Sequence, residues 1–237
     1  MKRDEIEPYG TLRELAPGLV CLDGRWKKAP FGRRMTVIRL GGGGLLVHNA
    51  IRLREEDYGA LDALGEVRII VAPNKMHSSE AHVYKLRYPE ARLYASRAST
   101  GAIAGRCPVD GTLPGDWDPS LDQEVACFEF GGTRMLHESV FFHRASRTLV
   151  LTDLVFNLQD DVEGATRWFF RINRIHKRFG PSRIFRHVFV RDREEARASF
   201  RRLMEWDFDR VIMSHGEILE SGGKAAMRRG FEEMGLA

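Results

Sequence analysis

The first half of the chain alternates short apolar segments with turn residues, a pattern typical of a sheet-rich fold. Residues 35–40 and 45–48 are β-prone and flank four consecutive glycines, which adopt positive φ angles without steric cost. This arrangement predicts a β-hairpin. Further strands are expected at residues 67–71, 92–95, 125–130, 139–143 and 148–152, and short helices at residues 55–64 and 80–87.

The strands in the middle of the chain carry continuous apolar runs. Residues 140–142 and 149–151 are uninterrupted by polar side chains, which indicates burial on both faces of a sheet. After residue 164 the pattern becomes helical. Helices are expected at residues 193–206 and 224–234, on either side of a last strand at residues 210–214. This order suggests two sheets stacked between helical layers.

One segment of the helical part pairs an apolar stripe with a cationic one. Trp168, Ile172, Ile175 and Phe179 follow helical spacing, and four arginines repeat that spacing one residue earlier. An amphipathic helix is therefore expected over this segment. The four cations are Arg167, Arg171, Arg174 and Arg178.

Length and composition are those of an ordinary globular protein. The chain has 237 residues, of which 43% are hydrophobic and 30% charged, so we expect a single domain over residues 1–237. No apolar run reaches the ~18–20 residues that span a bilayer, and the first residues contain no apolar core of a secretory signal. Three cysteines without metal-ligating spacing favour a reducing compartment. A cytoplasmic location is therefore expected.

The net charge of +4 is concentrated in the second half. Residues 164–202 contain 12 Lys/Arg and three acids, a local charge of +9. Two interpretations stay open: a solvated helical face, or a patch at which the four arginines hold an anionic part of a ligand. Binding of nucleic acid or of an acidic membrane through this helix is not favoured, because packing explains its aromatic residues as well.

Side chains capable of chemistry stand directly after three of the predicted strands. His77, Asp153 and His215 occupy these places, where loops present side chains from a rigid scaffold. Two imidazoles and a carboxylate suit a divalent cation such as Zn²⁺ or Fe²⁺ and leave positions open for water. Taken singly, each residue also fits a structural role. His48, at the end of the hairpin, is assigned none.

The order of these features resembles the metallo-β-lactamase fold superfamily over about residues 18–220. The hairpin at residues 35–49 is similar to the opening strands of that fold. Residues 67–80 take the place of its strand and H-x-H-x-D-H metal loop. Within the superfamily, residues 71–77 and 206–216 resemble a divergent branch of unassigned function. The resemblance implies an α/β fold of four layers, an αββα sandwich.

Two further segments carry the resemblance. Residues 139–156 are similar to the strand, turn and strand that end at a metal-bridging aspartate, here Asp153. Residues 210–216 resemble the last strand, whose terminal metal histidine, here His215, is followed by glycine. The resemblance thus implies metal ligation by both residues. In the reaction that a bound metal would support, Asp153 is also expected to orient the attacking water.

The metal loop of the resembled fold is degenerate in this chain. Only His77 remains as an imidazole there, beside Asn74 and Glu80, while His137 and Glu138 lie near the place of the middle metal histidine. Asn74, His137 and Glu138 are therefore possible additional ligands. Glu80 or Glu138 is also a candidate fourth ligand or general base.

The number of ligands limits the number of metal ions. A site for two metals needs six or more good ligands, and the chain offers three to five, so one ion of zinc or iron, or none, is expected. Two functions follow from these alternatives. One is a metal-dependent hydrolase that activates water against a small molecule with an ester, amide, thioester or phosphoester bond. The other is a catalytically inactive ligand-binding or regulatory protein that keeps the fold.

Overall fold

The larger sheet has seven strands and orders the first half of the chain. In the computed structural model the described residues are 6–26 and 30–237, so residues 1–5 and 27–29 of the expected domain lie outside them. In spatial order the strands are β1 (Ile6–Ala16), β2 (Leu19–Trp26), β3 (Arg33–Arg39), β4 (Gly44–His48), β5 (Glu66–Ala72), β6 (Arg92–Ser96) and β7 (Gly111–Leu113).

The pairing in this sheet changes from antiparallel to parallel at β4. Strands β1 to β4 form antiparallel hairpins, whereas β4 to β7 pair parallel. Parallel neighbours need crossover connections, which are usually helices. Here these are α1 (Glu55–Leu64), α2 (Ala81–Arg87) and α3 (Arg97–Ala104).

The smaller sheet brings together strands from the second half of the chain. Its order is β13 (Arg210–Ile212), β10 (Thr148–Val150), β9 (Ser139–His143) and β8 (Val125–Glu129). Strands β10 and β13 are parallel although they are far apart in the sequence: Thr148 lies opposite Arg210 and Val150 opposite Ile212. Their carboxyl ends therefore share one edge, and the loops that follow them meet there.

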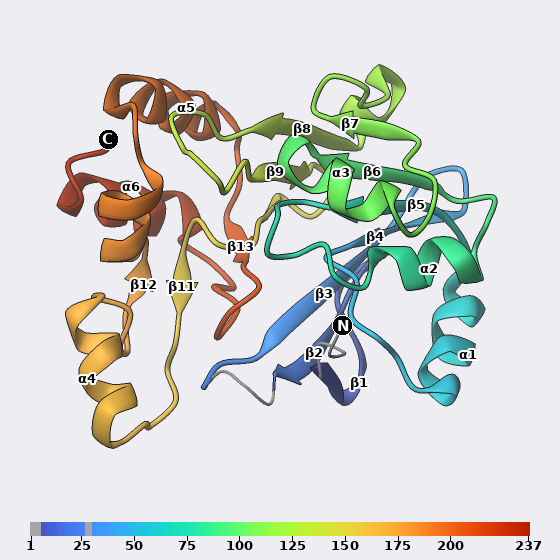
Figure 1. Ribbon diagram of the computed structural model, residues 1–237, viewed down its shortest axis with the longest axis horizontal. Helices are drawn as coiled ribbons and strands as arrows, with labels where there is room; N and C mark the ends of the chain where they lie inside the picture. The colour runs from blue at the N-terminus through green and yellow to red at the C-terminus, as the bar shows by residue number, and fades with distance from the viewer. Residues whose placement is uncertain (1–5, 27–29) are drawn as a thin grey trace.

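Three clusters of buried side chains hold four layers together. Val71 of the larger sheet and Phe141 of the smaller one belong to the cluster between the sheets. Tyr84 of α2 belongs to the cluster on the outer face of the larger sheet. Phe200 of α5 (Arg193–Glu205) stacks on Phe231 of α6 (Gly223–Glu233), with ring centroids 4.5 Å apart, on the outer face of the smaller sheet. The α/β four-layer αββα sandwich is thereby confirmed (Figure 1).

The expected hairpin is confirmed, but it does not open the sheet. It corresponds to β3 and β4, with Val37 opposite Val47. An earlier hairpin, β1–β2, precedes it, so the assignment of residues 35–49 as the opening pair is wrong. Residues 10–16 of β1 are exposed or half-buried, as is common for an edge strand, and such a strand leaves little apolar signal in the sequence.

The helix expected from the apolar stripe ends early. α4 covers Gly164–Ile172 and does not continue to Phe179. Asn173 donates its side-chain Nδ2 to the Phe169 carbonyl, and the next residue, Arg174, has a left-handed φ of 58°. Asparagine competes well for such helix-end carbonyls. The chain then turns back, and Phe179 lies in β12 (Phe179–Gly180), which pairs with β11 (Phe156–Asn157).

This early end divides the cationic stripe. Arg167 and Arg171 are exposed on α4, while Arg174 lies beyond the helix. Arg178 forms an ion pair with Glu233 of α6. The expectation that the four arginines share one helix face is therefore wrong, because the backbone reverses between the second and third of them.

The remaining helical elements are short. They are a 3-10 helix at Pro119–Gln123 and a π-helical turn, η2, at Phe185–Phe189. Among the described residues, no helix combines the length and apolar character required to cross a membrane. Cys21, Cys107 and Cys127 are all free thiols.

Candidate metal centre

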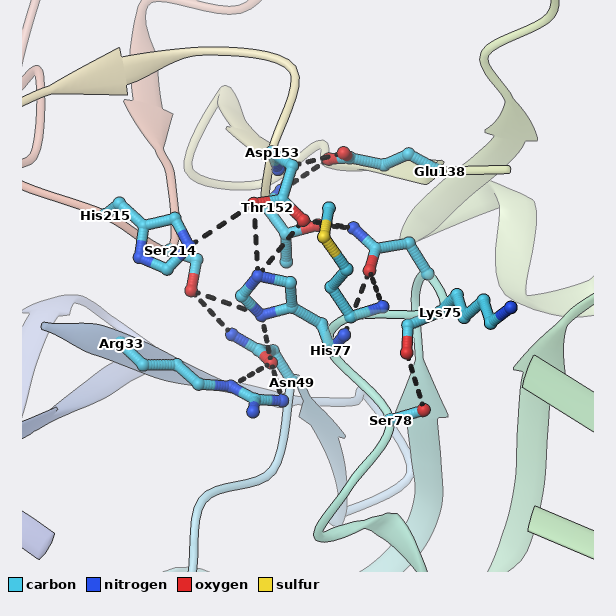
Figure 2. A network of polar contacts seen from close by, with 12 residues as sticks. Arg33, Asn49, Lys75, His77, Ser78, Glu138, Thr152, Asp153, Ser214 and His215 are labelled. Carbon is cyan, nitrogen blue, oxygen red and sulfur yellow. Dashed lines mark hydrogen bonds and ion pairs between the residues drawn. The ribbon is translucent and has the colours of Figure 1, made fainter. Parts of the chain in front are cut away.

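Three side chains from separate strand ends meet at one point. His77 lies in the loop after β5, Asp153 in the loop after β10 and His215 in the loop after β13. All three are buried, and their ligand atoms lie within 4.8 Å of one another. His77 Nε2 is 3.1 Å from Asp153 Oδ2, and His215 Nε2 is 3.3 Å from Asp153 Oδ1 (Figure 2). The strand-end argument therefore selected residues that converge.

Asn49 orients the imidazole of His77. Its Oδ1 accepts hydrogen bonds from Arg33 Nε and Nη2, at 2.9 and 2.8 Å, which identifies this atom as the amide oxygen. His77 Nδ1 lies 2.9 Å from the same oxygen and must therefore be the donor. The Nδ1–H tautomer leaves the Nε2 lone pair facing Asp153 (Figure 2).

His215 is held in the same tautomer by a backbone carbonyl. Its Nδ1 donates to Gly32 O at 2.6 Å, which leaves its Nε2 lone pair on the side of Asp153. The ring stacks on Phe156 at an interplanar angle of 9°, and Phe31 meets it edge-on with centroids 4.7 Å apart. These contacts hold the ring direction from both sides.

Two polar residues secure the loop that carries Asp153. Asn74 donates Nδ2 to Asp153 Oδ2 at 2.7 Å and accepts the His77 backbone N–H on Oδ1, so it joins the two loops. Glu138 accepts the backbone N–H groups of Thr152 and Asp153 at 2.5 and 2.9 Å. Burial, together with the charge of Asp153, raises the pKa of Glu138 to about 8 although these hydrogen bonds oppose the shift.

The electrostatics of the centre favour a negatively charged set of ligands. Burial lowers the pKa of His77 to about 4, so its ring is neutral near pH 7. Burial alone would raise the pKa of Asp153, but the neighbouring His77 and His215 outweigh it and hold that pKa well below its ordinary value. Asp153 is therefore a carboxylate at neutral pH.

The arrangement fits a bound cation. Both histidines use their Nδ1–H on oxygen acceptors, as metal-ligating histidines usually do. Their Nε2 lone pairs then face the unprotonated carboxylate of Asp153, so hydrogen-bond acceptors oppose one another without a proton between them. A cation bound among these atoms would remove that repulsion. The three atoms are close enough to share one ion, whose bonds to nitrogen and oxygen measure about 2.0–2.2 Å. This is the one such set among the described His, Cys, Asp and Glu residues.

A cavity of about 440 Å³ opens beside the three ligands. Arg33 is the one guanidinium group among its described wall residues. The apolar part of its wall includes Phe31, Phe156, Phe169, Ile175, Ile184 and Phe189. A concave, mostly apolar site with a few converging polar groups is typical of small-molecule binding.

Comparison with protein-family models and with curated proteins gives no match. Solved structures match over nearly the whole chain. The metallo-β-lactamase from Erythrobacter litoralis has a TM-score of 0.63 at 12% identity, over 98% of this chain and 99% of that one. FIM-1 from Pseudomonas aeruginosa, in its mono-zinc form, has 0.61 at 13% identity, over 98% and 94%. The metallo-β-lactamase from Pontibacter korlensis has 0.61 at 11% identity, over 98% and 100%.

The chain has the metallo-β-lactamase fold. Identities of 11 to 13% to these three structures place it far from them in sequence, as the degenerate metal loop already indicates. The residues that replace that loop can now be located within the fold.

Two of the possible additional ligands in that region, Asn74 and Glu138, hold the loops by hydrogen bonds and do not face the centre as metal ligands. The amide nitrogen of Asn74 donates to Asp153 and Thr152, and its amide oxygen accepts backbone N–H groups of its own loop. Glu138 lies beside the loop that carries Asp153, and both of its carboxylate oxygens accept backbone N–H groups (Figure 2). A role for Glu138 as ligand or general base disagrees with this placement, because its oxygens point at the backbone.

His137 and Glu80 lie away from the three ligands. His137 Nδ1 pairs with Glu129 Oε1 at 2.9 Å, and Glu80 pairs with Arg52 at 3.2 Å. Neither residue belongs to the metal-ligand set or to the described cavity wall. The expectations of His137 as a ligand and Glu80 as a base disagree with the structure, because each already has an oppositely charged or hydrogen-bonding partner elsewhere.

The cationic patch is also separate from the centre. None of Arg167, Arg171, Arg174 and Arg178 belongs to the described wall of the cavity. His48 is buried against Phe141 of the smaller sheet, with ring centroids 5.2 Å apart. It does not line the cavity either.

Sequence reasoning missed Asn49. This residue directly follows β4 and has a left-handed φ of 57°. Its Nδ2 donates to Arg34 O and Ser214 Oγ, and its Oδ1 serves His77 and Arg33. The signal was available, since Asn49 is a polar residue at a strand end like His77, Asp153 and His215.

Proposed function

We propose that this protein is a metal-dependent hydrolase that uses one divalent cation, zinc or iron, held by His77, Asp153 and His215. Its substrate is a small molecule that enters the adjacent cavity. The observation that carries the proposal is the orientation of both imidazoles: each Nδ1–H is bound to an oxygen, and each Nε2 faces the Asp153 carboxylate. A set of three protein ligands also leaves positions open for water and substrate.

The fold and the chemistry of the ligands support a single ion. FIM-1, which shares the fold, was solved in a mono-zinc form, so one zinc is compatible with this architecture. Two imidazoles and one carboxylate suit either zinc or ferrous iron. A cytoplasmic location remains part of the proposal, and the three free thiols agree with a reducing compartment.

The residues of the chain have distinct roles in this proposal. A divalent ion at this place would supply hydroxide near neutral pH, since it lowers the pKa of a bound water to about 7 from 15.7 in bulk. Asp153, fixed by Asn74 and by the contacts of Glu138 to its backbone, would hold such an ion together with His77 and His215 and would orient the water. Phe31 and Phe156 keep bulk water from the His215 ring.

Metal content tests the proposal directly. After expression with added zinc or iron and desalting, we expect close to one metal ion per chain by inductively coupled plasma mass spectrometry. The double variant His77→Ala/His215→Ala should lose that ion. His143→Ala is the matched control, because His143 is buried but binds Ser146 outside the centre.

The outcomes separate the two candidate functions. One ion per chain, lost in the double variant, together with turnover of at least one ester, amide or phosphoester, supports the hydrolase. Bound metal without turnover across such a panel would support the inactive ligand-binding alternative. Wild-type protein that holds no transition metal after supplemented expression would overturn the proposal.

A further inference from the structure

The cavity beside the candidate metal centre has a chemical character that limits the substrate. Three of its apolar wall residues, Ile175, Ile184 and Phe189, come from the chain beyond α4. This chain segment turns back toward the centre because the helix ends at Ile172. The early end of α4 thus provides apolar walls where a continuous helix would carry its side chains elsewhere.

The charges around the cavity argue against a phosphate or another multiply charged substrate. Arg33 is the only Lys or Arg among the described wall residues, and its guanidinium already binds Asn49 Oδ1 and Ser79 Oγ. Phosphate groups in proteins are usually held by several cationic donors. The reacting group is therefore better matched by an uncharged carbonyl.

The mouth of the cavity is apolar as well. Phe169 and Met76 both belong to the wall and are 42% and 51% exposed. The apolar wall thus includes side chains that are exposed at the surface as well as buried ones. A hydrophobic group attached to the carbonyl would bind more tightly in this cavity, because burial of its apolar surface is favourable.

We infer that the substrates are carboxylic esters with an apolar acyl group, which occupies this cavity while the ester carbonyl lies at the metal centre. The inference rests on the proposed hydrolase function. In the reaction the acyl C–O bond breaks, water adds its hydroxyl to the acyl carbon, and the remaining proton of that water goes to the leaving alcohol. The products are one carboxylic acid and one alcohol, and no oxidant or reductant is needed.

Chain-length preference is the first test. With zinc-loaded protein, kcat/KM for 4-nitrophenyl octanoate should exceed that for 4-nitrophenyl acetate at least about tenfold, because the longer chain buries more apolar surface. Both esters release the same alcohol, so the difference reports the acyl group alone. A higher kcat/KM for the acetate would overturn the inferred substrate class while leaving the hydrolase proposal standing.

Two neighbouring residues of α4 provide a matched pair of variants. Phe169 lines the cavity, whereas Trp168 is 67% exposed and does not. Phe169→Asp should lower kcat/KM for the octanoate about tenfold and by a larger factor than for the acetate, whose short acyl group buries little apolar surface. Trp168→Asp should change neither value. Equal effects of the two variants on the octanoate would contradict the assigned cavity.

A second measurement needs neither metal nor turnover. The uncharged fluorophore N-phenyl-1-naphthylamine brightens in apolar sites, and we expect it to bind the metal-free protein and to be displaced by octanol more readily than by ethanol. Ile184→Asp should weaken its binding about tenfold. Val188→Asp, on the same turn but exposed and outside the wall, should not. Melting curves check that both variants fold.

The two measurements distinguish the possible failures. Fluorophore binding at the cavity without hydrolysis of any ester would overturn the substrate class and leave an apolar binding site. The hydrolase proposal would be overturned as well only if no amide or phosphoester were hydrolysed either. No fluorophore binding, or binding that is insensitive to Ile184→Asp, would overturn the cavity assignment whatever the metal content.

Discussion

Asn49 and Asn74 hold the candidate metal centre through their two-ended amides. Asn49 joins the His77 ring to Arg33 and to the end of β13, through Ser214. Asn74 joins the His77 loop to the Asp153 carboxylate. An amide both donates and accepts, so one residue can orient a ligand and tie it to a second strand end. An aspartate, which only accepts hydrogen bonds at neutral pH, could not supply both ends in this way.

Asn49→Ala should weaken metal binding without removing a ligand. Loss of the Oδ1 acceptor leaves the His77 tautomer and ring direction unspecified, and loss of such outer contacts typically costs about 10–100-fold in metal affinity. Competition titration with a zinc-binding dye measures the effect. Asn173→Ala is the control, because Asn173 makes an equally good side-chain bond at the end of α4. Equal zinc affinities of wild type and Asn49→Ala would contradict the assigned role.

At the level of secondary-structure elements, the position of His215 depends on a close approach of two chain segments. Gly216 forms a bridge with Asn157 of β11, and Glu217 N donates to Asn157 O at 2.8 Å. Arg34 reaches from β3 and donates to the carbonyls of Met213 and Gly216. β11, β13 and β3 thus define where the loop with His215 lies.

Gly216→Ala should destabilise the fold more than Gly222→Ala, because an added Cβ meets other atoms only at Gly216. A Cβ at Gly216, whose φ is 91°, would lie 2.2 Å from Asn157 O, whereas Gly222, with a φ of 69°, has nothing within 4 Å. Both variants carry backbone strain of about 1–2 kcal/mol. The clash should add about 1–3 kcal/mol to the cost of Gly216→Ala. Urea denaturation of both variants measures the difference, and equal midpoints would refute the clash.

At the scale of the whole molecule, the contact between the two sheets contains a buried ionisable side chain, His48. His48 is buried, packs against Phe141 of the opposite sheet, and its Nε2 has no hydrogen-bond partner among the described residues. Burial, together with the nearby His77 and Arg33, lowers the pKa of His48 to about 3. Protonation of this ring would therefore place an unpaired charge between the sheets.

Stability should fall in acid because of His48. The unfolded chain takes up this proton near its ordinary pKa of 6.5 and the folded chain only near a pKa of about 3. Acidification through that window therefore favours the unfolded state. Between pH 7.5 and 5.5 the loss from this residue is about 1.4 kcal/mol. Over this pH range we expect the free energy of unfolding of His48→Leu to fall by about 1.4 kcal/mol less than that of the wild type. Urea denaturation in the presence of EDTA measures the difference. Parallel pH dependence of the two proteins would contradict this.

Local pattern was sufficient for much of the architecture. The apolar run at 140–142 lies in buried strand β9, the run at 149–151 begins in buried strand β10, and the helix expected at 55–64 is α1. Such signals are local because apolar spacing reflects which side of an element is buried. Edge strand β1 and the end of α4 were missed because exposed strands and single capping residues leave little pattern.

The candidate ligands were predictable as residue types at strand ends, but their meeting point was not. His77, Asp153 and His215 follow strands that belong to two different sheets, and chain order does not encode the distance between sheets. Glu138 and His137, adjacent in sequence, face different partners in the fold. Sequence therefore specified layers, strands and the chemistry available at their ends. Which of these groups share one point, and which serve as their supports, follows from the packing of one sheet on the other.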